Sequence, residues 1–218
     1  PVALNGQAST NEDNAVVIDV ANLISDVDGD DLTVTATVPV ATQGSVTVSG
    51  TQITFTPAAD YNGTADISYT VTDDGIGALS ATGTIAVTVD PENDAPVMTI
   101  DASTVILSEG AETGDEVTDA DVTDADAGDS AEFAIIEGND AGIFSIDVST
   151  GEITLAQGLD DAEVGEHILT VQVTDGAGAT DTVVTTVTVA NVNEATVSSV
   201  ASLSVNATQD DAFVYTLP

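Results

Sequence analysis

Apolar residues alternate with threonine and serine along most of this 218-residue chain. Such alternation puts every second side chain on one face, which predicts β-strands with one face in a core. The clearest runs lie at residues 45–48, 52–56, 67–71, 85–89, 168–173 and 183–189. Turn dipeptides such as Asn62-Gly63 and Asp175-Gly176 separate the strands, and no segment shows a convincing helical period. The pattern therefore predicts an all-β fold.

The strand pattern repeats at an offset of about 100 residues. Val87-Thr88-Val89 aligns with Val187-Thr188-Val189, and Asn93 aligns with Asn193. A repeat of this length indicates a tandem array. About 100 residues with roughly seven short strands and regular turns are typical of a Greek-key β-sandwich. We therefore predict two such sandwiches in a row.

A short acidic connector marks the boundary between the repeats. It runs from Asp90 to Pro96, and its two prolines stiffen it. We predict one domain at residues 1–94 and a second at residues 95–195. Residues 196–218 restart the pattern but are too few for a sandwich of their own. They are either the first strand of a truncated third repeat or a tail that donates a strand to another sandwich.

The charge of the chain is one-sided. It has 38 aspartates and glutamates, no lysine or arginine, and a formal net charge of −38. Nucleic acid and anionic lipid are therefore unfavourable partners. Many acids are clustered, as in residues 26–31 and 119–129, although two such charges about 4 Å apart repel by about 4 kcal/mol at a protein surface. Calcium, which takes about six to eight oxygen ligands, would compensate this repulsion. The alternative is a set of acidic turns on a salt-adapted surface.

Other classes of protein are disfavoured by what the sequence lacks. Cysteine is absent, which excludes disulfides and thiolate metal sites. No apolar stretch approaches the roughly 20 residues of a membrane span, so we expect no direct membrane insertion. The acids lie in predicted loops at domain ends, and no arrangement of a serine or cysteine nucleophile with histidine is evident. We therefore predict that the protein is not an enzyme.

Motifs in the second repeat resemble those of a bacterial cadherin domain. They are Ser108-Glu109-Gly110, Asp124-Ala125-Asp126, residues 144–153 and Val173-Thr174-Asp175. The resemblance implies a cadherin- or immunoglobulin-like sandwich, with calcium bound between consecutive domains. By position it implies metal ligands at Glu109, Asp124, Asp126, Asp160 and Asp175, together with linker residues Asn93 and Asp94. Where the family has Leu-Asp-Arg-Glu, this chain has Leu159-Asp160-Asp161-Ala162, so Asp161 or Glu163 would replace the missing glutamate.

The first repeat resembles the cadherin-like tandem repeat of very large bacterial surface proteins. The motifs that carry this resemblance are Asn11-Glu12-Asp13, residues 26–30, residues 56–63 and residues 71–75. By position the resemblance implies further calcium ligands at Glu12, Asp26, Asp28, Asp30 and Asp73. It also implies the extender region of a giant adhesin of the repeats-in-toxin type, exported by type I secretion, and hence a location outside the cell.

These observations predict a calcium-stiffened structural extender segment of a bacterial extracellular adhesin or surface filament, which supports cell adhesion or biofilm contacts. Ca2+ is the expected cofactor. Neighbouring repeats of the same chain are the expected partners, and other copies would join by strand addition or homotypic contact. The lack of basic residues favours a marine or saline habitat. The alternative is a calcium-dependent homotypic or polysaccharide-binding module attached to a carbohydrate-active enzyme, although only 3% of residues are aromatic.

Overall fold

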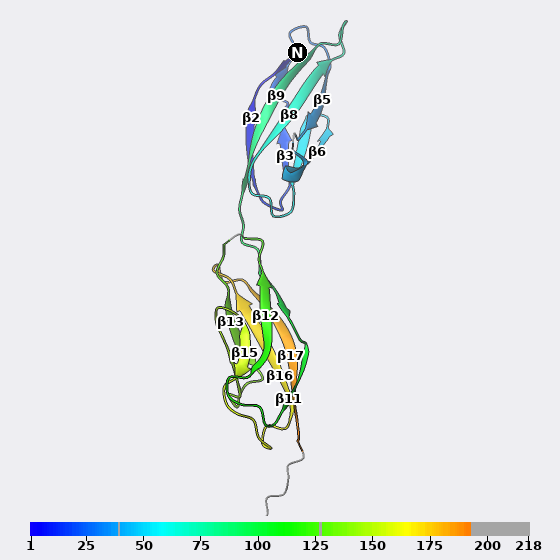
Figure 1. Cartoon of the computed structure of the whole chain (residues 1–218). Coiled ribbons are helices and arrows are strands. Elements are labelled where there is room, and N and C mark those ends of the chain that lie inside the picture. Colours follow the sequence, from blue (N-terminus) through cyan, green and yellow to red (C-terminus); the bar gives the residue numbers. More distant parts are fainter. Residues whose placement is uncertain (39, 127, 193–218) are drawn as a thin grey trace, which may run out of the picture.

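Two β-sandwiches stand end to end, joined by a single short linker (Figure 1). The computed structural model describes residues 1–38, 40–126 and 128–192. The predicted all-β fold of tandem sandwiches is confirmed: one three-residue 3-10 turn, η1 (Ala41–Gln43), is the only helical element in these ranges. None of the described helices could therefore cross a membrane. The proposed third-repeat strand or donor tail lies outside the described residues, as does the end of the predicted second domain.

The first sandwich comprises the strands before the linker. Its larger sheet has the order β2-β9-β8-β5, and a second sheet has the order β3-β7-β6, with a short pair β1-β4 beside them. β2 and β9 run parallel, whereas the other pairs are antiparallel. The strands are β1 (Val2–Ala3), β2 (Gly6–Asn11), β3 (Val16–Asp19), β4 (Ile24–Ser25), β5 (Leu32–Thr37), β6 (Gly44–Ser49), β7 (Gln52–Pro57), β8 (Gly63–Asp73) and β9 (Ser80–Asp90).

The second sandwich repeats this topology. Its sheets have the orders β11-β17-β16-β13 and β10-β12-β15-β14, and β11 again runs parallel to the last strand, β17. The strands are β10 (Val97–Ile100), β11 (Thr104–Ser108), β12 (Glu116–Thr123), β13 (Glu132–Glu137), β14 (Phe144–Ile146), β15 (Glu152–Leu155), β16 (Gly165–Thr174) and β17 (Thr180–Ala190). The parallel pair matters for the site, because it brings the end of an early strand beside the end of the last strand.

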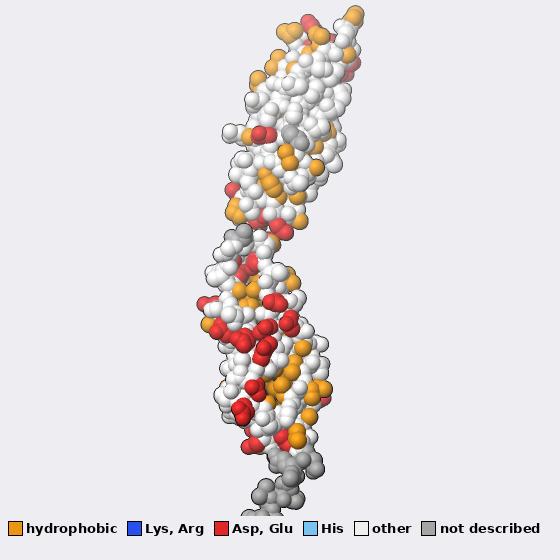
Figure 2. All heavy atoms as spheres, viewed as in Figure 1, with side chains coloured by type: hydrophobic (Ala, Val, Ile, Leu, Met, Phe, Trp, Pro, Cys, Tyr) orange, Lys and Arg blue, Asp and Glu red, His pale blue; other side chains and the backbone are white. Residues whose placement is uncertain are grey.

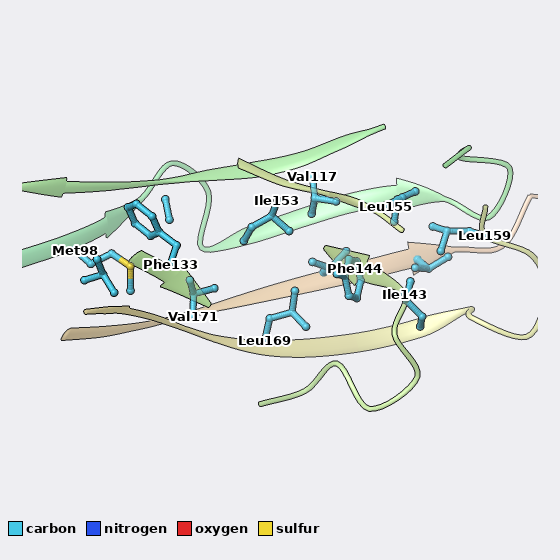
Figure 3. Close-up of a cluster of buried hydrophobic side chains, with 14 residues drawn as sticks. Met98, Val117, Phe133, Ile143, Phe144, Ile153, Leu155, Leu159, Leu169 and Val171 are labelled. Atoms are coloured by element: carbon cyan, nitrogen blue, oxygen red, sulfur yellow. The ribbon is translucent and has the colours of Figure 1, made fainter. Parts of the chain in front are cut away.

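Each sandwich has its own hydrophobic core. Alternate residues of the strands point inward, as the sequence pattern predicted, and their apolar side chains fill the space between the two sheets. Figure 3 shows the second core, in which Phe133, Ile153 and Leu169 lie between facing strands. The first core is built in the same way around Phe55 and Ile67. The two cores share no residue, so each sandwich buries its own apolar surface.

Tyr69 is the largest fully buried side chain of the first core. Its hydroxyl donates a hydrogen bond to the Leu4 carbonyl. The neighbouring strand leaves room for the ring at Gly83, where a Cβ would lie 2.6 Å from Tyr69 Cε1. Burial raises the pKa of Tyr69 above its ordinary value of 10.0 because the phenolate would lose its hydration.

We expect Tyr69→Phe to lower the free energy of unfolding by about 0.5–1.5 kcal/mol, since the Leu4 carbonyl loses its donor. The variant should also lose a pH dependence. Above pH 10.0 the phenol of the unfolded chain ionises, whereas the folded-state pKa of Tyr69 is raised, so wild-type stability falls as pH rises through this window. Urea unfolding below and above this pH tests both effects, with Tyr61→Phe as the control. Equal alkaline losses in wild type and Tyr69→Phe would contradict the assignment.

Candidate metal centre between the two sandwiches

The twelve predicted site residues fall into three groups along the molecule. Two of these groups lie at opposite ends of the second sandwich, along the β16–β17 hairpin. Asp175 directly follows β16, at the turn of the hairpin. Glu109 follows Ser108, which pairs with Ala190 at the open end of the hairpin. One group lies at the N-terminal end of the first sandwich, one at the linker and one at the far end of the second sandwich. Their members are Asp26, Asp28, Asp30 and Asp73; then Glu12, Asn93, Asp94, Asp124, Asp126 and Asp175; then Glu109 and Asp160.

Glu12 ties the base of the first sandwich to the linker. It follows β2, and the parallel partner β9 brings Asp90 beside it, so that the Glu12 N–H donates to the Asp90 carbonyl at 2.9 Å. The side chain is 3% exposed. Its Oε1 accepts the Glu92 N–H at 2.6 Å, and its Oε2 accepts Asn62 Nδ2 at 3.2 Å. The carboxylate is therefore held in place at the start of the linker.

Carboxylates of the second sandwich hold the other half of the linker. Asp126 Oδ2 accepts the Asp94 N–H at 2.8 Å, and Asp175 Oδ2 accepts Asn93 Nδ2 at 2.8 Å. Asp126 is itself positioned because its N–H donates to Asp124 Oδ1 at 2.9 Å. Three consecutive linker residues thus contact acidic side chains, the first of them from one sandwich and the next two from the other.

Three clusters of carboxylates meet at this junction. Within each cluster one oxygen from every member lies within 4.8 Å of the others. Asp94 belongs to two of them, so the linker joins the clusters of both sandwiches. Figure 2 shows the concentration of acidic side chains around the linker and on the second sandwich. The clusters are Glu12 with Asp94 and Asp126; Asp13 with Asp60 and Asp94; and Asp124 with Asp129 and Asp175.

Two pKa shifts describe the electrostatics of the junction. Desolvation raises the pKa of Asp94, and the carboxylates of Asp60, Asp126, Asp13 and Glu12 raise it further. The pKa of Asp175 is lowered instead, first by the Asn93 amide and then by backbone N–H groups of residues 177–179. The surrounding carboxylates therefore oppose ionisation of Asp94, and a cation there would relieve this repulsion.

The donor set fits a hard divalent cation. Every cluster at the junction offers carboxylate oxygens and no imidazole or thiolate. Calcium takes about six to eight such oxygens and tolerates irregular geometry, whereas zinc prefers nitrogen or sulfur ligands in a tetrahedral arrangement. The chemistry of these residues therefore fits calcium.

The N-terminal end of the first sandwich repeats the second sandwich's part of the junction. Asp26, Asp28 and Asp30 form a fourth carboxylate cluster within 4.8 Å, and Asp73 is buried next to it. Burial and the neighbouring aspartates raise the pKa of Asp30. A Cβ on Gly75 would lie 2.2 Å from Asp30 Oδ2, so the Gly75 backbone lies directly beside this carboxylate.

The far end of the second sandwich repeats the Glu12 arrangement. Glu109 is 3% exposed, and it accepts the Val192 N–H at 2.6 Å and Asn191 Nδ2 at 3.1 Å. Asn191 also donates to Asp161 Oδ1 at 3.1 Å. Asp161, one of the two proposed replacements for the missing motif glutamate, thus lies beside Glu109. Glu163, the other, accepts the Asp160 N–H instead.

The structure adds Asp13, Asp60 and Asp129 to the predicted residues. The sequence could have indicated Asp60 as a ligand, because it aligns with the predicted ligand Asp160 at the 100-residue offset. For Asp13, the only indication in the sequence was its position next to Glu12. Its φ of +56° and the φ of +54° at Asp60 put both backbones in the left-handed region, which aspartate tolerates better than most residues. Asp129 stood unassigned at the end of the acidic run 119–129.

Comparison with known proteins relates both halves of the chain to cadherin domains. A family model described as a cadherin-like domain matches residues 1–89, and a model described as a cadherin domain matches residues 103–193. Human protocadherin gamma-B4 is 37% identical over 115 residues, which cover 51% of this chain and 12% of that protein. Human protocadherin Fat 4 is 38% identical over 130 residues, which cover 57% of this chain and 2% of that protein. The chain therefore spans a small part of these relatives.

Solved structures share the fold of the whole tandem. Domains EC1–2 of human protocadherin-24 superpose with a TM-score of 0.58 at 19% identity, covering 85% of this chain and 95% of that one. Domains EC1–4 of Drosophila N-cadherin give a TM-score of 0.57 at 17% identity, covering 87% of this chain and 49% of that one.

The chain is thus built of tandem cadherin-like domains, the class of extracellular module that cell-adhesion proteins use. Cadherin domains in general bind calcium, and the relatives are adhesion proteins rather than enzymes.

Proposed function

We propose that this chain is a calcium-stiffened extender segment of an extracellular adhesin, in which calcium fixes one sandwich relative to the next. The observation that carries the proposal is the linker itself, since Glu92 contacts a carboxylate of the first sandwich and Asp94 one of the second. Calcium would be held by the three junction clusters. We divide the chain into domains at residues 94 and 95, so that each domain contributes half of the ligands.

The physical effect of the metal follows from the charge. Without a cation, the clustered carboxylates repel one another and the linker is held by a few hydrogen bonds. A calcium ion bound by both sandwiches removes the repulsion and the freedom of the linker together. Extracellular calcium modules have dissociation constants of roughly 10⁻⁴ to 10⁻³ M, so such sites fill outside a cell. Binding to the folded state also stabilises it, by about 2.7 kcal/mol at 100 times the dissociation constant.

The groups of predicted ligands at the two outer ends of the tandem resemble the two halves of the junction. The cluster of Asp26, Asp28 and Asp30 with Asp73 matches the second sandwich's half of the junction, and Glu109 with Asp160 and Asp161 matches the first sandwich's half. We propose that each is a half-site, which a neighbouring cadherin-like domain completes. Calcium would then stiffen a longer array, and neighbouring repeats would be the main partners.

The finer assignment, to a bacterial surface adhesin or filament that supports biofilm contacts, rests on the resemblance of the repeats to those of large bacterial surface proteins, and the composition adds a saline habitat. A chain with 38 acids and no lysine or arginine is tolerable where salt screens its charge. Seawater or another saline medium supplies both the screening ions and the calcium. We therefore propose the exterior of a cell in a saline habitat as its location.

Small-angle scattering with circular dichroism tests the proposal. In millimolar calcium we expect a stiff rod, and in chelator at constant ionic strength we expect a broader distribution of interdomain angles with β-sheet content largely retained. Magnesium at the same concentration is the control for general screening of charge. Identical scattering profiles in calcium and in chelator would contradict calcium stiffening.

A further inference from the structure

The side-chain amide of Asn62 contacts the carboxylate of Glu12. Its Nδ2 donates to Glu12 Oε2 at 3.2 Å, from an exposed position between β7 and β8. Glu12 in turn lies in the cluster with Asp94 and Asp126. Any change that turned this amide into a carboxylate would replace a hydrogen-bond donor of the junction by a further negative charge.

The residue after Asn62 makes that change chemically accessible. Asparagine amides are lost when the next backbone nitrogen attacks the side-chain carbonyl carbon, and glycine in the next position offers no Cβ to hinder the attack. Gly63 has a φ of +124°. Among the described residues, a Cβ there would meet only Tyr61 Oη within 4 Å, at 3.7 Å. The backbone at this point is therefore uncrowded.

We propose that Asn62 is a site of spontaneous deamidation, which converts the donor to Glu12 into an additional carboxylate of the calcium junction. The Gly63 nitrogen forms a bond to Asn62 Cγ as the Cγ–Nδ2 bond breaks, and ammonia leaves with the proton of that nitrogen. Water then opens the cyclic imide at one of its two carbonyls, which yields aspartate or isoaspartate. Both products carry a carboxylate. The consequence for calcium rests on the function proposed above.

The chain contains two internal comparisons for this site. Asn191 donates to Glu109 at 3.1 Å, much as Asn62 donates to Glu12, but Val192 follows it and a β-branched side chain hinders the attack. Asn5 is also followed by glycine, and Gly6 begins β2 as Gly63 begins β8, but Asn5 Oδ1 accepts the Thr84 N–H at 2.9 Å, which holds its side chain against β9. Asn5 belongs to none of the carboxylate clusters found among the described residues. Of these three asparagines, only Asn62 is followed by glycine and also contacts a candidate metal ligand.

The added charge has opposite effects with and without calcium. In the metal-free protein, a carboxylate beside Glu12 repels it and loosens its hold on the linker. In the presence of calcium, the extra charge attracts the ion, since calcium affinity rises with the number of charged ligands around the site. Deamidation would therefore make the rigidity of the junction depend more steeply on calcium as the molecule ages.

Mass spectrometry of the aged full-length chain tests the modification. A glutamate-specific protease separates the three asparagines into peptides 1–12, 13–92 and 167–194, and fragment spectra localise the mass change. After incubation in mildly alkaline buffer with chelator, we expect conversion at Asn62 well before conversion at Asn191, and faster than at Asn5. Conversion at Asn62 no faster than at Asn191 would overturn the proposal.

Calorimetric calcium titration of Asn62→Asp tests the consequence, with Asn5→Asp as a matched control for the same change of charge. We expect the dissociation constant to fall several-fold in Asn62→Asp and to stay at the wild-type value in Asn5→Asp, with circular dichroism in calcium showing that both fold. Equal dissociation constants in the two variants would overturn the effect on the junction. A wild-type chain without calcium binding would refute the proposed function and this effect together, while the masses would still decide the modification site.

Discussion

Glu12→Gln is expected to weaken calcium binding at the junction by at least about tenfold, because a change in the ligand set or its supporting contacts commonly costs that much affinity. Glu12 is the buried carboxylate that the first sandwich contributes to the cluster with Asp94 and Asp126. Glutamine keeps the shape and can still accept the Glu92 N–H, so the loss measures the charge rather than the fold. Isothermal titration of calcium into the full chain gives the dissociation constant.

The matched control for Glu12→Gln is Glu166→Gln. Glu166 is exposed on β16 and belongs to none of the carboxylate clusters found among the described residues. Both variants remove one charge from the chain, so general electrostatics changes equally in the two. If Glu12→Gln binds calcium as tightly as Glu166→Gln, then Glu12 takes no part in holding the ion, and Asp13, Asp60 and Asp94 are the carboxylates that remain on the side of the first sandwich. The proposed bridge from Glu12 through Asp94 to Asp126 would then be wrong.

Phe55→Ala is expected to destabilise the first sandwich by about 3–5 kcal/mol, since it removes a fully buried ring and leaves a cavity. Phe55 is 0% exposed and packs within a core separate from that of the second sandwich. Total stability of a domain is typically about 5–15 kcal/mol, so the loss is a large share of it. Hydrogen exchange read by mass spectrometry reports the two sandwiches separately, and the second should keep its protection.

Two further variants make that result interpretable. Ile153→Ala opens the corresponding cavity in the second core, where Ile153 is fully buried, and should remove protection there and not in the first sandwich. Val17→Ala changes a side chain that is 58% exposed and should alter neither sandwich measurably. Equal loss of protection in both sandwiches after Phe55→Ala would show that the junction couples their folding more strongly than separate cores suggest.

Much of the fold could be predicted from the alternation of apolar and hydroxyl side chains. Residues 52–56 lie within β7 and residues 168–173 within β16, because a strand with one face in the core must place every second residue inward. The pattern did not show which strands pair with one another in the sheets. The parallel contact of β2 with β9 joins residues nearly eighty positions apart, and no local signal encodes such a contact.

The sequence predicted which residues are candidate ligands, but it predicted only partly which of them lie close together. Asp124 and Asp126 could be found because a ligand pair two residues apart is visible in one loop. Glu109 was assigned to the same set of ligands, yet it lies at the opposite end of its sandwich, where Asn191 and Asp161 are its neighbours. Its counterpart Glu12 belongs to the preceding domain and meets the linker instead.

By itself, the amino-acid sequence determined that this protein is a tandem of β-sandwiches and that its acids are clustered, because strand periodicity and the spacing of charged residues both follow from neighbouring positions in the chain. Only the tertiary structure decided which carboxylates meet. It adds Asp13, Asp60 and Asp129 to the clusters and joins both sandwiches through Asp94. The reason is that a metal site depends on distances between loops at the ends of sheets, and those distances follow from how distant strands pair.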